Sequence, residues 1–558
     1  MRIFITVILA FFCTGISAQG LQLKWVKGIT GTDNVFGAQI VVDDQKNLFV
    51  KGGFSGTADF DPGVGTVNLM SSNGSQFIAK YDAQGNYVFA FQLIGIIEAI
   101  VLDVSGNIRI TGKYDSTTDF DPGSGIAQLP TVSGSNNYYL AKYDNNGNYI
   151  KAFRLAYCSK SIGINAMVTD TDDNLYITGD FSGTAVFNPT NGTSVLVSNG
   201  SNIDVFMAKY SGDGSLIYAF RLGGTGGDRG WDIAIDPIGN AYLIGAFYET
   251  VDLDPGSGIA SFTFPGLNGF LARFSPTGSY LEGYGFDPAL YTIALDSIGN
   301  IYLTGHLQDS MDVDPGPGVV KLYSDYEIDI FMEKLNAGGK FQHAYAFKSN
   351  KYYFENGIAV DDQSSVYLYG YLQDTVYFSS AGSTGILATE GGRDGFLTKF
   401  DSSGNYLNGF SFGSTGVDEL SSLVVNKLGD IWIAGTFNGT VDFDPGSGAA
   451  NLTSTPKTGI FFGRYTDRQT TTDINRFQFK QQQAKVYGFD KKVYVDFTAM
   501  ELVDAHVKVL NILGQTVAQT KHIRNDILQI ELPNLPSQIF VVIIQNDGFT
   551  SAKKVWVD

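Results

Sequence analysis

The sequence is poor in the residue types that many catalytic and nucleic-acid-binding sites require. Its 558 residues include only 2 cysteines and 4 histidines, and 37 Lys and Arg residues stand against 56 Asp and Glu residues. The formal net charge is −19. Phosphate binding needs clustered Lys and Arg, so this balance argues against nucleic acid as a partner and favours cations or neutral ligands.

Cysteine is too scarce for a disulfide framework or a Cys-based zinc site. Residues 1–18 combine an early arginine, an apolar run and terminal small residues, which predicts a secretory signal peptide and an exported protein. Cys13 leaves with that segment, and Cys158 is then expected to be a small buried thiol. No other apolar stretch is long enough to span a bilayer.

Motifs of several enzyme classes are also missing. The sequence has no H-E-x-x-H and no Gly-Lys-Ser/Thr phosphate loop, so zinc proteases and P-loop enzymes lack their residues. His306 occupies a place that other repeats give to Lys113, Asp180 or Ala246, and it is interpreted as a surface substitution. Two carboxylates brought together by folding leave no linear motif, so a polysaccharide-acting hydrolase or lyase is the alternative to a binding protein.

The sequence is instead rich in glycine, aromatic residues and an acidic repeat. With Gly 67, Tyr 30 and Phe 41, the composition is typical of a β-rich protein. The segment "TADFDPGVG" at 57 returns as "TTDFDPGSG" at 117, "TVDLDPGSG" at 250, "SMDVDPGPG" at 310 and "TVDFDPGSG" at 440. Degenerate copies near Asn188 and Ser379 bring the total to seven. The period of about 64 residues lies in the range of propellers and solenoids.

Each repeat reads as four short strands separated by turns. The recurrent D-x-x-G-N sequence predicts a hairpin in which Asp caps the turn and Gly adopts a left-handed conformation. The third strand carries a basic residue in all seven repeats, which indicates an architectural role: Lys80, Lys142, Lys209, Arg273, Lys334, Lys399 and Arg464. Some of them persist where the DxDP acids are absent, so aromatic rings or backbone carbonyls are expected as partners.

The two ends of the repeat region are staggered. The last repeat ends at residue 466 without a fourth strand, while residues 21–29 resemble a fourth strand and precede the first repeat. A closed ring explains this stagger, because the N-terminal strand completes the last blade and removes two open edges, whereas a solenoid does not. The sequence therefore predicts an all-β fold, with a seven-bladed β-propeller over residues 19–466 closed by its N-terminal strand.

The paired carboxylates of the DxDP motif have two interpretations. Pro-Gly after an Asp favours a turn. Alternation places both carboxylates on one face of a strand, however, and hard cations prefer clustered oxygen ligands, so calcium is the alternative. The turn is preferred because the longer D-x-D-x-D-G loop with its distal Glu is absent and two repeats lose the acids. The candidate calcium ligands are Asp59, Asp61, Asp119, Asp121, Asp252, Asp254, Asp312, Asp314, Asp442 and Asp444.

The repeat units "GNxYxTGxFxGTxDFDPGxG" and "DxFxAKYDxxGNYxxAFxLGG" resemble the secreted bacterial β-propeller repeats of the SBBP type. The resemblance covers about residues 21–466, and it implies a fold far more than an activity.

A polar linker at 467–484 precedes a C-terminal segment, residues 485–558, whose short alternating strands predict a small Ig-like β-sandwich. Its "VLNILGQTV", its L-x-x-LP step and its closing Lys553-Lys554-Val555 are similar to the C-terminal sorting domain of the type IX secretion system of Bacteroidetes. That resemblance implies the type IX machinery as a partner, with the protein secreted or held at the outer-membrane cell surface. A YPNP-like opening is absent, and Gln538 stands where such domains usually have Gly.

A specific ligand is expected where the repeats differ. The connections from the fourth strand of one blade to the first strand of the next vary most, and they emerge on the same face as the DxDP segments. The candidate ligand-binding residues there are Asp228, Arg229, Trp231, Tyr352, Tyr353, Glu355, Asp418 and Glu419. Such aromatic and charged groups suit a non-enzymatic module that binds an extracellular carbohydrate or protein. Packing between blades is the alternative role for Trp231 and the tyrosines.

Overall fold

The computed structural model describes most of the repeat region and parts of the C-terminal segment. The described residues are 20–188, 194–200, 202–324, 329–349, 353–380, 383–426, 429–467, 485–489, 492–496, 505–511, 516–522, 527–532, 538–546 and 549–557. The chain divides into two compact bodies, Met1–Gln469 and Thr470–Asp558. Every helix or strand element in the described residues is a β-strand, and no helix there could cross a bilayer. The predicted signal peptide and residues 468–484 of the predicted linker lie outside the described residues.

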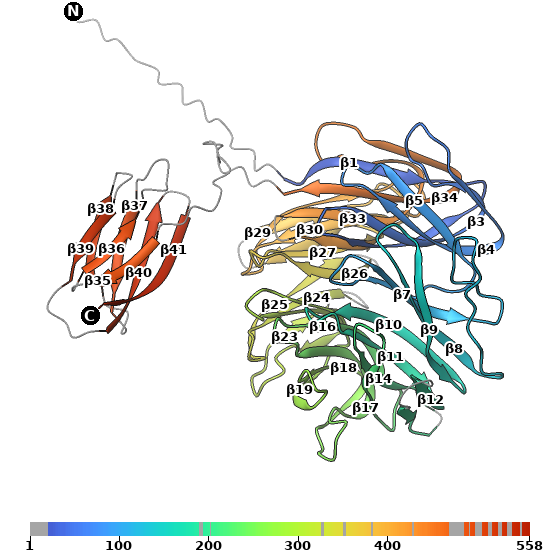
Figure 1. Ribbon diagram of the computed structural model, residues 1–558, viewed down its shortest axis with the longest axis horizontal. Coiled ribbons are helices and arrows are strands. Elements are labelled where there is room, and N and C mark those ends of the chain that lie inside the picture. The colour runs from blue at the N-terminus through green and yellow to red at the C-terminus, as the bar shows by residue number, and fades with distance from the viewer. Residues whose placement is uncertain are drawn as a thin grey trace, which may run out of the picture. The chain divides into compact units, whose positions relative to one another are not determined.

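The larger body consists of antiparallel units of four strands each (Figure 1). Units 1 and 2 contain β2 (Val35–Val42), β3 (Leu48–Asp59), β4 (Asn68–Tyr81) and β5 (Tyr87–Leu93), then β6 (Ala99–Leu102), β7 (Ile108–Tyr114), β8 (Asn136–Tyr143) and β9 (Tyr149–Cys158). Units 3 and 4 contain β10 (Ser161–Thr169), β11 (Leu175–Ser182), β14 (Asp204–Tyr210) and β15 (Leu216–Gly224), then β16 (Arg229–Ile235), β17 (Ala241–Asp252), β18 (Ser261–Phe274) and β19 (Tyr280–Phe286).

The remaining units follow the same order. Units 5 and 6 contain β20 (Leu290–Leu295), β21 (Ile301–Leu307), β24 (Asp329–Leu335) and β25 (Phe341–Ser349), then β26 (Tyr353–Val360), β27 (Val366–Leu372), β30 (Asp394–Phe400) and β31 (Tyr406–Phe412). Unit 7 contains β32 (Glu419–Val425), β33 (Asp430–Asp442), β34 (Asn451–Thr466) and β1 (Gln22–Ile29). Short hairpins between second and third strands are formed by β12 (Thr184–Phe187) with β13 (Ser194–Val197), β22 (Ser310–Asp312) with β23 (Lys321–Tyr323), and β28 (Val376–Ser380) with β29 (Ser383–Leu387).

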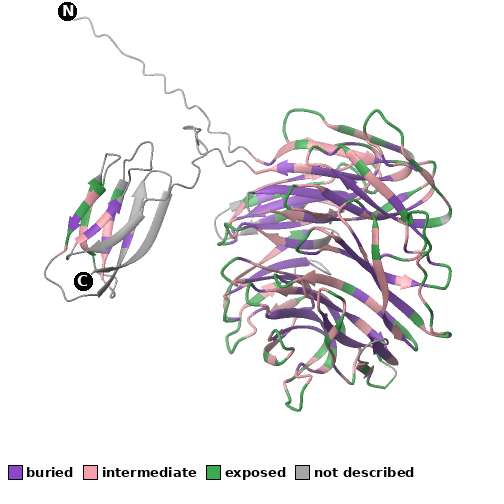
Figure 2. Ribbon diagram, viewed as in Figure 1, coloured by how far each residue is buried: buried purple, intermediate pink, exposed green. Residues whose placement is uncertain are grey.

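Both faces of each unit are covered by its neighbours. The third strands β14 and β30 are buried at every position, although alternate side chains point to opposite faces. Figure 2 shows the result, with buried residues along the strands and exposed residues gathered at the turns. This two-sided burial explains why these strands lack the alternation of buried and exposed residues that is typical of a sheet with one solvated face.

The first strand of the chain pairs with the last strand of the larger body. β1 is antiparallel to β34, with Leu23 opposite Tyr465, so the N-terminal strand supplies the fourth strand that the last repeat lacks (Figure 1). The first strands of successive units contact one another in the order β2, β6, β10, β16, β20, β26, β32, and β32 contacts β2 again. Across this last junction the rings of Tyr81 and Phe462 lie 4.2 Å apart.

The basic residue of each third strand rests on an aromatic ring in six units. Lys209 Nζ, for example, lies 4.6 Å from the centre of the Tyr176 ring. The same contact is made by Lys80, Arg273, Lys334, Lys399 and Arg464. Several of these cations also donate to a carbonyl in the next unit, and Arg464 closes the series on Ala83 O at 3.3 Å. The expectation of aromatic and carbonyl partners is therefore confirmed by the contacts.

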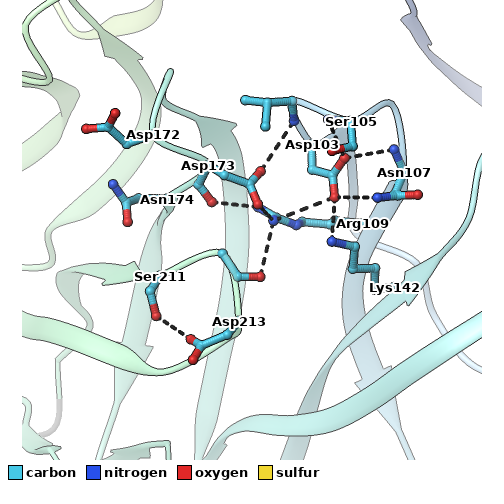
Figure 3. Close-up of polar contacts among 12 residues, drawn as sticks. Asp103, Ser105, Asn107, Arg109, Lys142, Asp172, Asp173, Asn174, Ser211 and Asp213 are labelled. Carbon is cyan, nitrogen blue, oxygen red and sulfur yellow. Dashed lines mark hydrogen bonds and ion pairs between the residues drawn. The ribbon is translucent and has the colours of Figure 1, made fainter.

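Unit 2 departs from this rule because Arg109 replaces the aromatic residue. Figure 3 shows Arg109 between Asp103 of its own unit and Asp173 of the next unit, with Lys142 bound to Asp103. Asp103 also accepts from the backbone N–H groups of Ser105 at 2.9 Å and Asn107 at 2.8 Å. This Asp thus caps its turn as the D-x-x-G-N sequence predicts, and Gly106 in the same turn has a φ of 76°.

The smaller body contains two sheets in its described residues. One sheet is formed by β35 (Lys485–Phe489), β36 (Lys492–Asp496) and β39 (Ile527–Glu531). The other is formed by β38 (Thr516–His522), β37 (Ala505–Leu510), β40 (Gln538–Asn546) and β41 (Phe549–Val557). The sheets contact each other, and both contribute buried aliphatic residues: Val493, Val495 and Ile530 from the first, and Val507, Val509 and Val542 from the second.

Glu333 in β24 is an anomaly within the larger body. Its side chain is fully buried, and neither carboxyl oxygen has a hydrogen-bond partner among the described residues. Burial raises the pKa of Glu333 well above its usual range, and the carboxylates of Asp314 and Asp312 raise it further. Four other units have alanine at the equivalent position, namely Ala79, Ala141, Ala208 and Ala272. Unit 5 therefore has a buried carboxyl group, with a raised pKa, where four other units have a methyl group.

We predict that Glu333→Met stabilises the protein increasingly as the pH rises. A raised pKa in the folded state means that folding retains a proton that the unfolded chain loses above about pH 4, so wild-type stability falls with rising pH up to the folded-state pKa. The difference in unfolding free energy between variant and wild type should grow by about 1 kcal/mol per pH unit in that interval. Urea unfolding measures it, with the exposed Glu390→Met as control. A difference that does not change with pH would show that Glu333 is not held neutral.

Candidate functional site

The DxDP carboxylates hold the backbone of their own loop. Asp59 Oδ1 accepts from the N–H groups of Asp61 at 3.1 Å and Val67 at 2.8 Å, and Asp61 Oδ1 accepts from Gly63 N at 2.8 Å. The first Asp thus closes a loop of eight residues, and the second caps the Pro-Gly turn. The other four copies make the same three bonds.

The same loops explain the second glycine of the motif. A Cβ at Gly65 would clash with Asp61 Oδ2, so this oxygen lies against the bare backbone of the glycine. Among the described residues there is no group of three or more His, Cys, Asp or Glu side chains arranged to hold a metal ion. These hydrogen bonds favour a structural role in the turn, and not calcium binding, for both acids. Metal analysis of the purified protein tests whether the loops bind calcium.

Two of the predicted ligand-binding acids lie inside the protein. Asp228 and Asp418 are fully buried. Asp228 Oδ2 accepts from Gly224 N at 2.8 Å, and Asp418 accepts from Ser414 N at 2.7 Å and Asn438 N at 2.8 Å. Burial raises the pKa of Asp228 to about 7, and the nearby Asp204 carboxylate adds to that rise. Both acids therefore fix the connections between units, and neither is exposed to a ligand.

Arg229 and Trp231 follow directly in β16. The guanidinium of Arg229 lies 5.5 Å from the centre of the Trp231 ring, and Arg229 is exposed while Trp231 is half-buried. Trp231 also contacts the next unit. The centre of its ring lies 5.8 Å from that of Tyr291, and the Tyr291 ring lies 4.5 Å from that of His306. Trp231 thus packs between units 4 and 5 and also supports an exposed cation.

Glu419 occupies the corresponding place in β32. Arg229 pairs with Ala246 in the strand register and Glu419 pairs with Thr436, each just before a register shift. Glu419 Oε1 accepts from Arg393 Nη1 at 3.1 Å, and the Arg393 guanidinium lies 4.8 Å from the Tyr371 ring. Of the remaining predicted residues, Tyr352 lies outside the described residues. Tyr353 and Glu355 belong to β26, but their side chains lie outside the described part.

Four polar residues that the sequence pattern does not single out connect neighbouring units: Glu98, Lys113, Asn165 and Asp180. Lys113 Nζ is 3.9 Å from Glu98 Oε1, and Glu98 Oε2 accepts from Ile164 N of the next unit at 3.0 Å. Asn165 Nδ2 donates to Asp180 Oδ1 at 3.1 Å and to Gly230 O, beside Arg229, at 2.8 Å. We call the set the inner-strand cluster: Glu98, Lys113, Asn165, Asp180, Arg229, Trp231, Tyr291 and His306.

Burial shifts three titratable groups of the inner-strand cluster toward their neutral forms. The pKa of Asp180 is raised by burial, against the lowering effects of Asn165, Arg229 and Lys113. Burial also raises the pKa of Glu98 and lowers that of His306 to about 4. His306 is half-buried and not a plain surface substitution. It shares one strand position with Lys113 and Asp180, and variation at this position was the sequence signal for the cluster.

No protein-family model matches the chain. The chain is 23% identical over 510 residues to an uncharacterized WD repeat-containing protein of Acanthamoeba polyphaga mimivirus, covering 76% of this chain and 36% of that protein. It is 24% identical over 409 residues to regulatory protein FlaEY of Caulobacter vibrioides, covering 69% of this chain and 42% of that protein. The chain therefore spans less than half the length of these relatives. Similarity to a WD-repeat protein favours a propeller-type repeat fold.

Two solved structures are similar to the chain at low TM-scores. A protein of unknown function from Bacteroides caccae is 9% identical, with a TM-score of 0.30 over 60% of this chain and 89% of that chain. A luciferin-regenerating enzyme is 10% identical, with a TM-score of 0.29 over 67% of this chain and 92% of that chain. TM-scores this low do not establish a shared fold.

We predict that Asp119→Ala lowers stability without any dependence on calcium. The change removes the acceptor for Asp121 N at 3.1 Å and Ala127 N at 2.8 Å, which should cost about 1–2 kcal/mol. Asp119→Asn keeps one side-chain oxygen and should cost less, and the exposed Ser124→Ala serves as control. Thermal unfolding with and without chelator, together with metal analysis of the purified protein, measures the effect. Bound calcium, or a wild-type melting temperature lowered by chelator, would instead establish these loops as metal sites.

Proposed function

We propose that the larger body is a seven-bladed β-propeller spanning residues 19–466 and that residues 485–558 form a small Ig-like sandwich. The pairing of β1 with β34 and the return of contacts from β32 to β2 support a closed ring. The two-sided burial of the third strands fits blades packed face to face. The WD-repeat relative supports the same architecture for the larger body.

The proposed function is that of an exported module that binds an extracellular carbohydrate or protein without turnover. The observation that carries it is the inner-strand cluster, where charged and aromatic side chains that differ between units lie together at the end of the body that bears the varied connections. Lys113 retains 41% side-chain exposure and Arg229 is exposed, so cations are available beside partly buried acceptors. In a protein built of near-identical units, a specific ligand is expected to bind at the place where the units differ.

A polysaccharide-acting enzyme is the second candidate. Glu98 and Asp180 both have pKa values raised by burial, and a raised carboxyl pKa suits a general acid. Both carboxyls are nevertheless already engaged, Glu98 with Ile164 N and Asp180 with Asn165. We therefore favour a positioning role for these acids, in which they order the cations around them.

A binding screen with turnover monitored tests the proposed function. The full chain should bind an extracellular glycan or surface protein saturably, and Lys113→Ala with Trp231→Ala should weaken binding about tenfold or more through loss of one cation and of the support for another. The matched control is Lys340→Ala, an exposed cation in the turn between the third and fourth strands, at the opposite end of the units.

Product formation that is lost in Glu98→Gln or Asp180→Asn would replace the binding proposal by the enzymatic one. Saturable binding that persists in the double variant would move the site away from the inner-strand cluster.

The C-terminal segment is proposed to direct the chain to the type IX secretion machinery. The sequence resemblance of residues 485–558 to sorting domains supports this proposal. Removal of residues 485–558 should leave the larger body in the periplasm, whereas the full chain reaches the cell surface or the medium. Cell fractionation and protease accessibility of the repeat body measure the outcome. Equal surface display of both chains would refute the assignment.

A further inference from the structure

Two arginines of the larger body rest on aromatic rings in similar surroundings, but only one has a carboxylate partner. Arg393 lies 4.8 Å from the Tyr371 ring and donates to Glu419 at 3.1 Å. Arg229 lies 5.5 Å from the Trp231 ring and forms no ion pair with a carboxylate of the described residues, although its charge acts against the rise in the pKa of Asp180. Arg229 is exposed, whereas Trp231 beneath it is half-buried between units. In the described part of the chain, one exposed guanidinium thus lies against an aromatic ring without an ion pair to a carboxylate.

We propose that Arg229 is a binding site for a carboxylate group on the ligand, and that the ligand is an acidic polysaccharide containing uronate residues. This inference rests on the proposed binding function and names its ligand class. A guanidinium binds a carboxylate through two parallel hydrogen bonds, and stacking on an aromatic face fixes its plane. Trp231 is a positioning residue in this arrangement. Its ring packs against Tyr291 on one side and supports the Arg229 guanidinium.

The neighbouring groups favour a glycan over an acidic peptide. Asn165 links Asp180 to the neighbourhood of Arg229, because it donates to Asp180 Oδ1 at 3.1 Å and to Gly230 O at 2.8 Å. The charges of Lys113 and Arg229 both act against the rise in the pKa of Asp180, which is a partly buried acceptor. A uronate chain repeats a carboxylate and hydroxyl groups along its length, and the hydroxyls can donate to a carboxylate such as Asp180 while the carboxylates meet the cations. An acidic peptide offers the charges without hydroxyls at a regular spacing.

The net charge of −19 does not prevent this contact. Repulsion between exposed charges is largely screened beyond about 8 Å at physiological ionic strength, whereas a direct guanidinium–carboxylate pair is shorter than that distance. We therefore expect binding to be weakened at very low salt, where repulsion between the acidic protein and an acidic polymer extends further.

The first test compares an oligogalacturonate with its methyl-esterified, uncharged counterpart, using the full chain and calorimetry. The charged oligomer should bind at least about tenfold more tightly, and Arg229→Gln should remove that preference. Arg393→Gln is the matched control, because this arginine is already neutralised by Glu419, and it should leave affinity unchanged. Circular dichroism shows whether each variant is folded.

The second test adds a site. Glu419→Ala removes the acceptor of the Arg393 guanidinium, so a second carboxylate site should form on the Tyr371 ring and raise the number of short oligomers bound per chain. Equal affinity for the two oligomers, unchanged binding by Arg229→Gln, or preference for an acidic peptide would overturn the inference while leaving the proposed binding function intact. Failure of every glycan and protein to bind the wild-type chain would instead overturn the proposed function.

Discussion

The pairing of β1 with β34 is the constraint on which the rest of the larger body depends. Each unit covers its neighbour, so a missing partner would expose both an edge strand and a large apolar face. At the junction of units 7 and 1, the ring contact between Tyr81 and Phe462 and the hydrogen bond from Arg464 to Ala83 O repeat contacts of the junction between units 1 and 2, where Phe91 meets Tyr143 and Lys80 donates to Asn145 O. The inner-strand cluster requires this frame, because its contacts pass from unit to unit and hold only when neighbouring units keep their places.

Much of this frame could be predicted from the sequence because repetition makes its rules visible. The D-x-x-G-N turns, the four strands per unit and the displaced fourth strand at residues 21–29 follow from local patterns that recur. The stacking of third-strand cations on aromatic rings also followed, since those cations persist where the DxDP acids do not. The role of Asp59 did not follow, because its bond to Val67 N closes a loop and depends on the path of the chain between them.

The site was harder to predict than the frame. Asp228 and Asp418 stand in the most variable connections, yet their carboxylates cap backbone N–H groups and are fully buried. Lys113 and Asp180 stand within regular strands, where a polar residue looks like a simple surface position. Lys113, Asp180 and Arg229 belong to three different units that meet at one place. No pattern within a single repeat contains that relation, so only the fold brings it to light.

Because the first strand of the repeat body pairs with its last strand, the body can finish folding only after the whole repeat region has been synthesised. Ile40 N donates to Ser422 Oγ, a contact between residues 382 positions apart. Such distant contacts form late, since the loop between them must first be ordered. During synthesis, the first unit must wait for the last, with its edge uncovered in the meantime. A chain that stops early can never cover that edge, and it presents to proteases and chaperones a surface that the complete repeat body conceals. The closing strand thereby makes full length a condition for escaping quality control.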